Sequence, residues 1–235
     1  MDWEDICRRP AIFLYAGDLP NGKTSLELRL KDHDFIGLSL SQDNARHINH
    51  DVTKRHLLPD NTVDIYQSEE VYHEIQVSYE SLPSVLNEVY RLLKPLYGVL
   101  RVSVPDYRCD IHHERRLKYG NSYPVPPNLI NDPLFEPFSM IPEIDDDMLT
   151  AGVRSATVGV TWLPVYETLK AAIESSLFNL NYRFYHYYTE DSMVVDPIDY
   201  SQGYISRTPD NDGRTSSPYR PLSLVVDCFK KEYSF

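Results

Sequence analysis

The chain has 235 residues, of which 42% are hydrophobic and 25% charged, a composition typical of one globular domain and unlike that of a disordered chain. Its 23 Lys and Arg against 35 Asp and Glu give a net charge of −12, which disfavours generic nucleic-acid binding because like charges repel. The acidic start lacks the features of a secretory signal, and no stretch is long and apolar enough to span a bilayer, so we expect a cytoplasmic protein without a membrane span.

The first half of the chain alternates between short apolar runs and helix-length segments. Apolar runs bounded by turn-forming residues predict strands at 11–16, 35–40, 47–52, 63–68 and 99–104. Apolar residues at three- and four-residue spacing predict a helix over 81–94, which Pro95 ends. Strands separated by such segments imply right-handed crossovers and a parallel sheet covered on both faces.

The second half begins with a stretch rich in proline, at about 107–147, which we interpret as an insertion or lid over the acceptor side of a cleft. A helix is predicted over 165–177 and strands at 182–188 and 221–229. The whole pattern predicts a single α/β domain, with a doubly wound, mostly parallel sheet of seven strands and helices on both faces.

The middle of the chain carries a resemblance to a known family. The stretches LLPDNTVDIYQSEEVYHEI and LPSVLNEVYRLLKPLYGVLRVSVPD resemble class I S-adenosylmethionine-dependent methyltransferases of the small, glycan-associated "predicted SAM-dependent methyltransferase" type. The resemblance covers 12–106 and resumes at VYETLKAAIESSLF and RPLSLVVDCFKK. It implies a Rossmann-like fold with S-adenosyl-L-methionine as cofactor and S-adenosylhomocysteine as product.

The resemblance also implies where the cofactor binds. The loop after the first strand would approach the methionine part of the cofactor, and the end of the second strand would approach its ribose. The residues after the third strand would contact its adenine, and the end of the fourth strand lies on the same rim of the sheet. These positions are Tyr15, Ala16, Gly17, Asp18, Ser39, Leu40, Asp51, Val52, Ser68 and Glu69.

This chain departs from the family at two of these positions. The loop FLYAGDLPNGK has only two glycines, Gly17 and Gly22, where the family has several. Ser39 stands where an acidic residue normally holds both ribose hydroxyls. Asp51 fits the position that accepts the adenine amino proton, with the Val52 amide meeting a ring nitrogen, although Asp51 could instead cap a turn before Thr53.

Three residues are candidates for a catalytic base, namely Asp106, His73 and His112. Asp106 ends the fifth predicted strand, at the rim where an acceptor must meet the sulfonium; capping of the turn after Pro105 is the alternative. No metal is assigned, because neither the scattered cysteines nor the clusters at 112–114 and 145–147 have a recognised ligand spacing. Metal dependence stays open.

The sequence therefore predicts methyl transfer from S-adenosylmethionine, with a sugar hydroxyl of a glycan or glycoconjugate as the acceptor by family analogy. Positioning supplies much of the rate of such a transfer, so no catalytic triad is required. The alternative is a non-catalytic or partner-dependent methyltransferase-like binding module. A nicotinamide-dependent reductase is disfavoured because the G-x-G-x-x-G fingerprint is absent. Whether the chain forms a homo-oligomer stays open.

Overall fold

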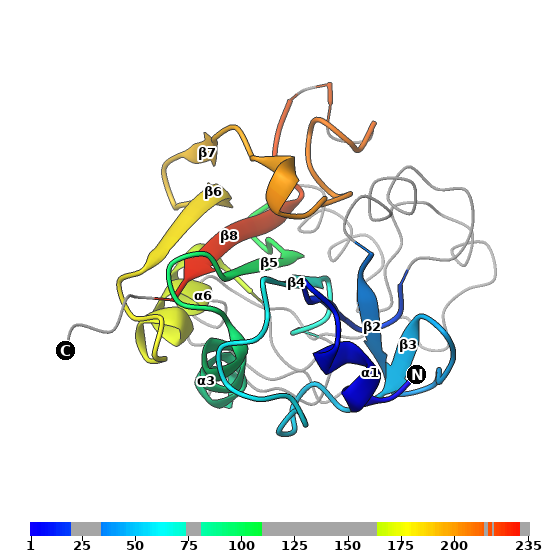
Figure 1. Ribbon diagram of the computed structural model, residues 1–235. Helices are drawn as coiled ribbons and strands as arrows, with labels where there is room; N and C mark the ends of the chain where they lie inside the picture. Colours follow the sequence, from blue (N-terminus) through cyan, green and yellow to red (C-terminus); the bar gives the residue numbers. More distant parts are fainter. Residues whose placement is uncertain (20–33, 74–80, 110–163, 214–215, 218, 231–235) are drawn as a thin grey trace, which may run out of the picture.

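A computed structural model of the chain describes residues 1–19, 34–73, 81–109, 164–213, 216–217 and 219–230. Its centre is an eight-stranded sheet in the order β3-β2-β1-β4-β5-β8-β6-β7 (Figure 1). The strands are β1 (Phe13–Ala16), β2 (Ile36–Ser39), β3 (His47–Asn49), β4 (Ile65–Glu69), β5 (Val99–Pro105), β6 (Tyr182–Tyr188), β7 (Met193–Val195) and β8 (Ser223–Phe229).

The strand directions divide the sheet into two parts. Strands β1 to β5 pair in parallel, whereas β8 runs antiparallel to both of its neighbours, β5 and β6. The chain crosses from β3 back over β1 to reach β4, which places the switch point of the doubly wound order between β1 and β4. The prediction of a doubly wound, mostly parallel Rossmann-like sheet is confirmed.

The predicted count of seven strands was one too few. The additional strand, β7, has three residues and forms a hairpin with β6; the turn is closed by the Thr189 amide, which donates to the Ser192 carbonyl at 2.8 Å. This strand directly follows the polar turn at 189–192 and carries no apolar run as long as those used to predict the other strands. Its hydrogen bonds come from β6.

The ends of the predicted elements shifted in one place that matters for the site. Strand β3 ends at Asn49 rather than at residue 52, so residues 50–52 lie on a loop at the carboxyl edge of the sheet.

A five-residue helix, α1 (Trp3–Cys7), was not predicted. It begins with a capping box, in which the Asp5 amide donates to the Asp2 carboxylate at 2.8 Å.

One face of the sheet is apolar and carries the main core. Helices α3 (Leu82–Leu92) and α6 (Tyr166–Glu174) lie against this face (Figure 1), and their buried side chains join those of α1 and of the strands in one cluster. Helices were predicted on both faces; the described α-helices all contribute to this one core, and residues 20–33, 74–80 and 110–163 lie outside the described residues. None of the helices that the structure describes is long and apolar enough to cross a membrane.

The opposite face carries a row of polar side chains in register on four adjacent strands: Tyr15 on β1, Gln67 on β4, Arg101 on β5 and Asp227 on β8. Arg101 has no exposed surface, and its Nε and Nη2 donate to the two carboxylate oxygens of Asp227 at 2.7 Å each. The segment around the short 3-10 helix η2 (Tyr200–Gln202) covers this row, because the Asp199 carbonyl accepts from Arg101 Nη1 at 2.8 Å.

We expect the Asp227→Ala variant to lower the free energy of unfolding by about 3–5 kcal/mol, because removal of one partner leaves the other charge buried and uncompensated. Chemical denaturation measures this. Arg183→Ala is the control: Arg183 lies in register with Asp227 on β6, but its ion pair with Asp196 is exposed and is worth less than about 1 kcal/mol. Equal losses in the two variants would contradict a special role of the buried pair.

Candidate functional site

A pocket of about 200 Å³ opens at the carboxyl edge of β1, β2 and β3. It is lined by Gly17, Asp18, Leu38, Leu40, Ser41, His50, Asp51, Val52 and Val71. Five of these residues are among the predicted cofactor ligands: Gly17, Asp18, Leu40, Asp51 and Val52. The other four, Leu38, Ser41, His50 and Val71, were missed because the resemblance assigned no cofactor contact to their positions.

The loop after β1 forms one wall of this pocket and depends on a glycine at its first position. Gly17 has φ +87°, a left-handed conformation that other residues rarely adopt. Its amide donates to the Leu38 carbonyl at 2.8 Å, and a Cβ at this position would lie 3.2 Å from Val71 Cγ2. One glycine therefore suffices for the turn at this position.

Asp18 follows on the same wall, with an exposed carboxylate. Burial acts to raise its pKa, but hydrogen bonds from Ser39 and Gln42 outweigh that effect, and the pKa lies below its ordinary value. The Asp18 Oδ2 atom also lies 3.4 Å from Ser41 Oγ, which donates to it. An ionised carboxylate thus stands beside the end of β2, but it comes from the β1 loop.

Ser39 ends β2 and is almost fully buried. Its Oγ accepts hydrogen bonds from the backbone amides of Ser41, at 3.0 Å, and Gln42, at 2.8 Å. This hydroxyl therefore shapes the turn after β2, and Ser39 is not among the residues that line the pocket.

The loop after β3 supplies the opposite wall through His50, Asp51 and Val52. Asp51 Oδ1 accepts from both the amide and the hydroxyl of Thr53, at 2.9 and 2.7 Å, so the turn-capping interpretation holds for this oxygen. The other oxygen, Oδ2, has no hydrogen-bond partner among the described residues. Burial and the neighbouring His56 lower the pKa of His50 to about 4, so His50 is neutral near pH 7.

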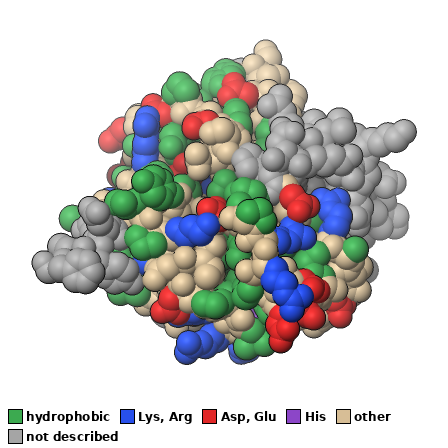
Figure 2. Space-filling model, in the orientation of Figure 1, with side chains coloured by type: hydrophobic (Ala, Val, Ile, Leu, Met, Phe, Trp, Pro, Cys, Tyr) green, Lys and Arg blue, Asp and Glu red, His purple; other side chains and the backbone are tan. Residues whose placement is uncertain are grey.

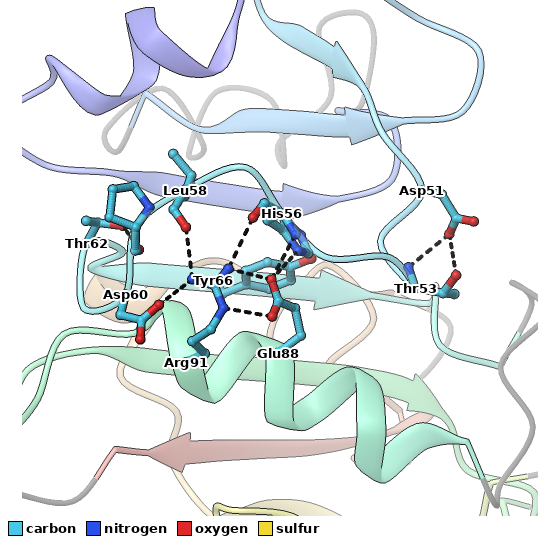
Figure 3. A network of polar contacts seen from close by, with 10 residues as sticks. Asp51, Thr53, His56, Leu58, Asp60, Thr62, Tyr66, Glu88 and Arg91 are labelled. Atoms are coloured by element: carbon cyan, nitrogen blue, oxygen red, sulfur yellow. Dashed lines mark hydrogen bonds and ion pairs between the residues drawn. The ribbon is translucent and has the colours of Figure 1, made fainter.

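Glu88 and Arg91 of α3 fasten this loop to the core (Figure 3). The Glu88 carboxylate accepts from the His56 amide at 2.8 Å, and Arg91 donates to the carbonyls of Leu58 and His56 at 2.9 and 3.1 Å. Burial acts to raise the pKa of Glu88, but hydrogen bonds from Arg91 and His56 hold it well below its usual range. The pocket wall is therefore tied to α3, whose apolar face is buried in the core.

The remaining predicted cofactor residues lie beside the pocket without lining it. The Tyr15 ring packs on the polar face in a cluster with Leu19, Phe35 and Ile65, while Ala16 and Ser68 are buried neighbours on β1 and β4. Glu69 is 7% exposed, and its Oε1 accepts from the Ser206 amide at 2.7 Å. Burial raises the pKa of Glu69, and the Ser206 hydrogen bonds oppose that rise.

Of the predicted bases, Asp106 and His73 are described, and neither lines the pocket. Asp106 is fully buried, and its two carboxylate oxygens accept from the backbone amides of Arg108 and Tyr188, at 2.9 Å each. Burial raises its pKa to about 7, against the lowering effect of these two amides. His73 is also fully buried, in the segment that follows β4. His112 and the proline-rich stretch from residue 110 onward lie outside the described residues. The geometry of Asp106 therefore agrees with the turn-capping alternative.

We expect the Asp106→Asn variant to be less stable by about 1–3 kcal/mol, because its amide group would face one of two backbone N–H donors. Equilibrium unfolding measures this loss of stability. The control is Asp196→Asn, because the Asp196 side chain is exposed. Full stability of the Asp106→Asn protein together with a loss of turnover would restore Asp106 as a catalytic base.

Charges are mixed on the face of the molecule shown in Figure 2. Described Lys and Arg side chains are scattered there among Asp and Glu and do not gather in one basic patch. Within the described part of the chain, no three His, Cys, Asp or Glu side chains are grouped so that they could hold a metal ion.

No protein-family model and no curated protein sequence matches the chain. Among solved structures, it is similar to a SAM-dependent methyltransferase from Thermotoga maritima, described as a possible histamine N-methyltransferase, at 14% identity and a TM-score of 0.47, over 96% of this chain and 84% of the other. It is also similar to an S-adenosylmethionine-dependent methyltransferase from Clostridium acetobutylicum, at 10% identity and a TM-score of 0.46, over 97% and 88% of the two chains.

A third similar structure is the 16S rRNA (adenine(1408)-N(1))-methyltransferase from Catenulisporales acidiphilia, at 9% identity and a TM-score of 0.41, over 98% of this chain and 92% of the other. At these identities the likeness concerns the fold alone.

Proposed function

We propose that the protein is an S-adenosylmethionine-dependent methyltransferase and that the pocket receives the adenosine part of the cofactor. The observation that carries this proposal is the convergence of the Gly17 loop, the Asp18 carboxylate and the Asp51–Val52 segment on one pocket at the carboxyl edge of the sheet, the edge where doubly wound folds bind ligands. A volume of about 200 Å³ is below the roughly 300–1,000 Å³ of whole ligand sites, which suits part of the cofactor.

The lining residues match the chemistry of adenosine. Leu38 and Leu40 provide apolar surface for a planar base, and the open Oδ2 of Asp51 can accept a hydrogen bond from the adenine amino group. The Val52 amide makes no hydrogen bond to a described residue and can donate to a ring nitrogen. We propose that Asp18 takes the role of the acid missing at residue 39, since its carboxylate lines the pocket beside Ser41 and can accept from the ribose hydroxyls.

When bound, the cofactor would supply a methyl group on a positively charged sulfur. An acceptor would form its bond to that carbon as the carbon–sulfur bond breaks and S-adenosylhomocysteine leaves, so the protein contributes mainly by holding the two reactants in position. We propose a sugar hydroxyl as the acceptor, on the basis of the sequence resemblance. A hydroxyl must lose its proton, and with Asp106 engaged by two backbone amides, His73 and His112 are the proposed candidates to receive it.

Isothermal calorimetry with S-adenosylhomocysteine tests the proposal most directly. We expect saturable binding by the wild-type chain, together with a rise in its melting temperature, because a ligand that binds only the folded state stabilises it. Absence of both effects at millimolar ligand would refute the proposed function. Transfer of labelled methyl groups to a panel of glycan and non-glycan acceptors then tests the acceptor class.

We expect the Asp51→Asn variant to bind S-adenosylhomocysteine more weakly by about 1–3 kcal/mol, because its amide would face the adenine amino group, donor against donor. Its remaining oxygen can still cap the turn at Thr53. The matched control is Thr53→Val, which removes one hydrogen bond to Asp51 and leaves the carboxylate; its affinity should stay near that of the wild type. Equal affinity of Asp51→Asn and wild type would place adenine recognition elsewhere.

A second candidate function is a non-catalytic or partner-dependent binding module. The hydrogen bonds of Ser39 and Asp106 with backbone amides favour it, because part of the hydrogen-bonding capacity of these two side chains is already used within the protein. This function predicts that the chain binds S-adenosylhomocysteine but transfers no methyl group to any acceptor by itself.

A further inference from the structure

His47 is a buried histidine that connects the loop after β1 to strand β3. It is the first residue of β3 and is 3% exposed. Its Nε2 accepts a hydrogen bond from the Leu19 amide at 3.0 Å. The contact joins the end of the β1 loop to a strand 28 residues further along the chain.

The neighbours of the ring determine which nitrogen carries the proton. His47 Nδ1 lies 3.1 Å from Asn44 Oδ1, and the Arg46 amide donates to this same Asn44 atom at 2.8 Å, which identifies it as the amide oxygen. An amide oxygen only accepts, so Nδ1 is protonated and Nε2 presents a lone pair to Leu19. Burial also lowers the pKa of His47, in agreement with a neutral ring.

Gly37 on β2 makes room for this ring. Gly37 is in register with His47 on the adjacent strand. A Cβ on Gly37 would overlap His47 Cδ2 and lie 2.8 Å from His47 Nε2, closer than real Cβ atoms come to other atoms. It would also lie 3.1 Å from the Gly17 carbonyl oxygen, a tight contact. The absence of a side chain at residue 37 is therefore a requirement of the histidine and of the loop that it holds.

We infer that His47 is the positioning residue of the cofactor loop, and this inference rests on the proposed function. The backbone of Leu19 is held by the His47 hydrogen bond and its side chain by the cluster with Tyr15 and Phe35. Asp18, the proposed ribose ligand, lies between Leu19 and the Gly17 turn. In a loop with few glycines, a side chain thus performs the task of fixing the backbone next to the ligand.

The test compares two substitutions of His47 that differ in one property. His47→Phe fills the space over Gly37 but offers no acceptor to Leu19, whereas His47→Gln keeps an acceptor oxygen. If the loop leaves its binding position in a fraction of molecules, the apparent affinity falls by that fraction. We expect His47→Phe to bind S-adenosylhomocysteine roughly 5- to 150-fold more weakly, the range for an unsatisfied buried donor, and His47→Gln to bind nearly as the wild type does.

The matched control is His186→Phe, a second buried histidine, on β6, whose Nε2 lies 3.2 Å from the Asp196 carbonyl. It should lose stability without losing affinity. Should His47→Phe not fold, Gly37→Ala displaces the ring from the other side and should weaken binding in the same way. Wild-type affinity in His47→Phe, or an equal loss in His47→Gln, would overturn the inference.

Amide hydrogen exchange of Leu19 in the free protein separates this inference from the proposed function. We expect slow exchange in the wild type and in His47→Gln, and faster exchange in His47→Phe, whether or not the chain binds the cofactor. Absence of S-adenosylhomocysteine binding by the wild type would refute the proposed function, while unchanged Leu19 exchange in His47→Phe would refute the role of His47.

Discussion

The Arg101 side chain lies in the middle of the sheet without exposed surface, and its buried charge constrains the strands and the segment packed around it. A buried guanidinium needs a carboxylate and further acceptors, since desolvation of an unpaired charge costs several kcal/mol. Asp227 satisfies it from β8, and the carbonyls of Asp199 and Gly203 satisfy it from the covering segment. One side chain therefore determines which strand lies beside β5 and which segment covers that face.

The two faces of the sheet consequently have different tasks. The apolar face buries α3 and α6 and supplies most of the core. The polar face uses directed contacts, which hold segments that are distant in the chain. The two walls of the pocket are held in different ways. Glu88 and Arg91 fasten the loop after β3 to helix α3. The backbone of the loop after β1 is joined to β3 through His47.

The sequence was sufficient for features that depend on neighbouring residues. Strand and helix patterns are local, so the doubly wound α/β fold could be predicted. The family resemblance, carried by the middle of the chain, implied Gly17, Asp18 and Asp51, which line the pocket. It was insufficient where a partner lies far along the chain. The Asp106 contact with Tyr188 spans 82 residues and the His47 contact with Leu19 spans 28, and neither leaves a periodic signal. The short elements α1 and β7 were also missed, and the hydrogen bonds of β7 come from its partner β6.

The position of β8 has a consequence for how the protein is made. This strand occupies the place between β5 and β6, yet residues 223–229 leave the ribosome after both of its neighbours. Until then β5 presents an unpaired edge and the Arg101 side chain has no carboxylate, and unpaired edges of this kind invite association with other chains. The nascent protein thus passes through an incomplete state in which protection by a chaperone would have the greatest effect on yield.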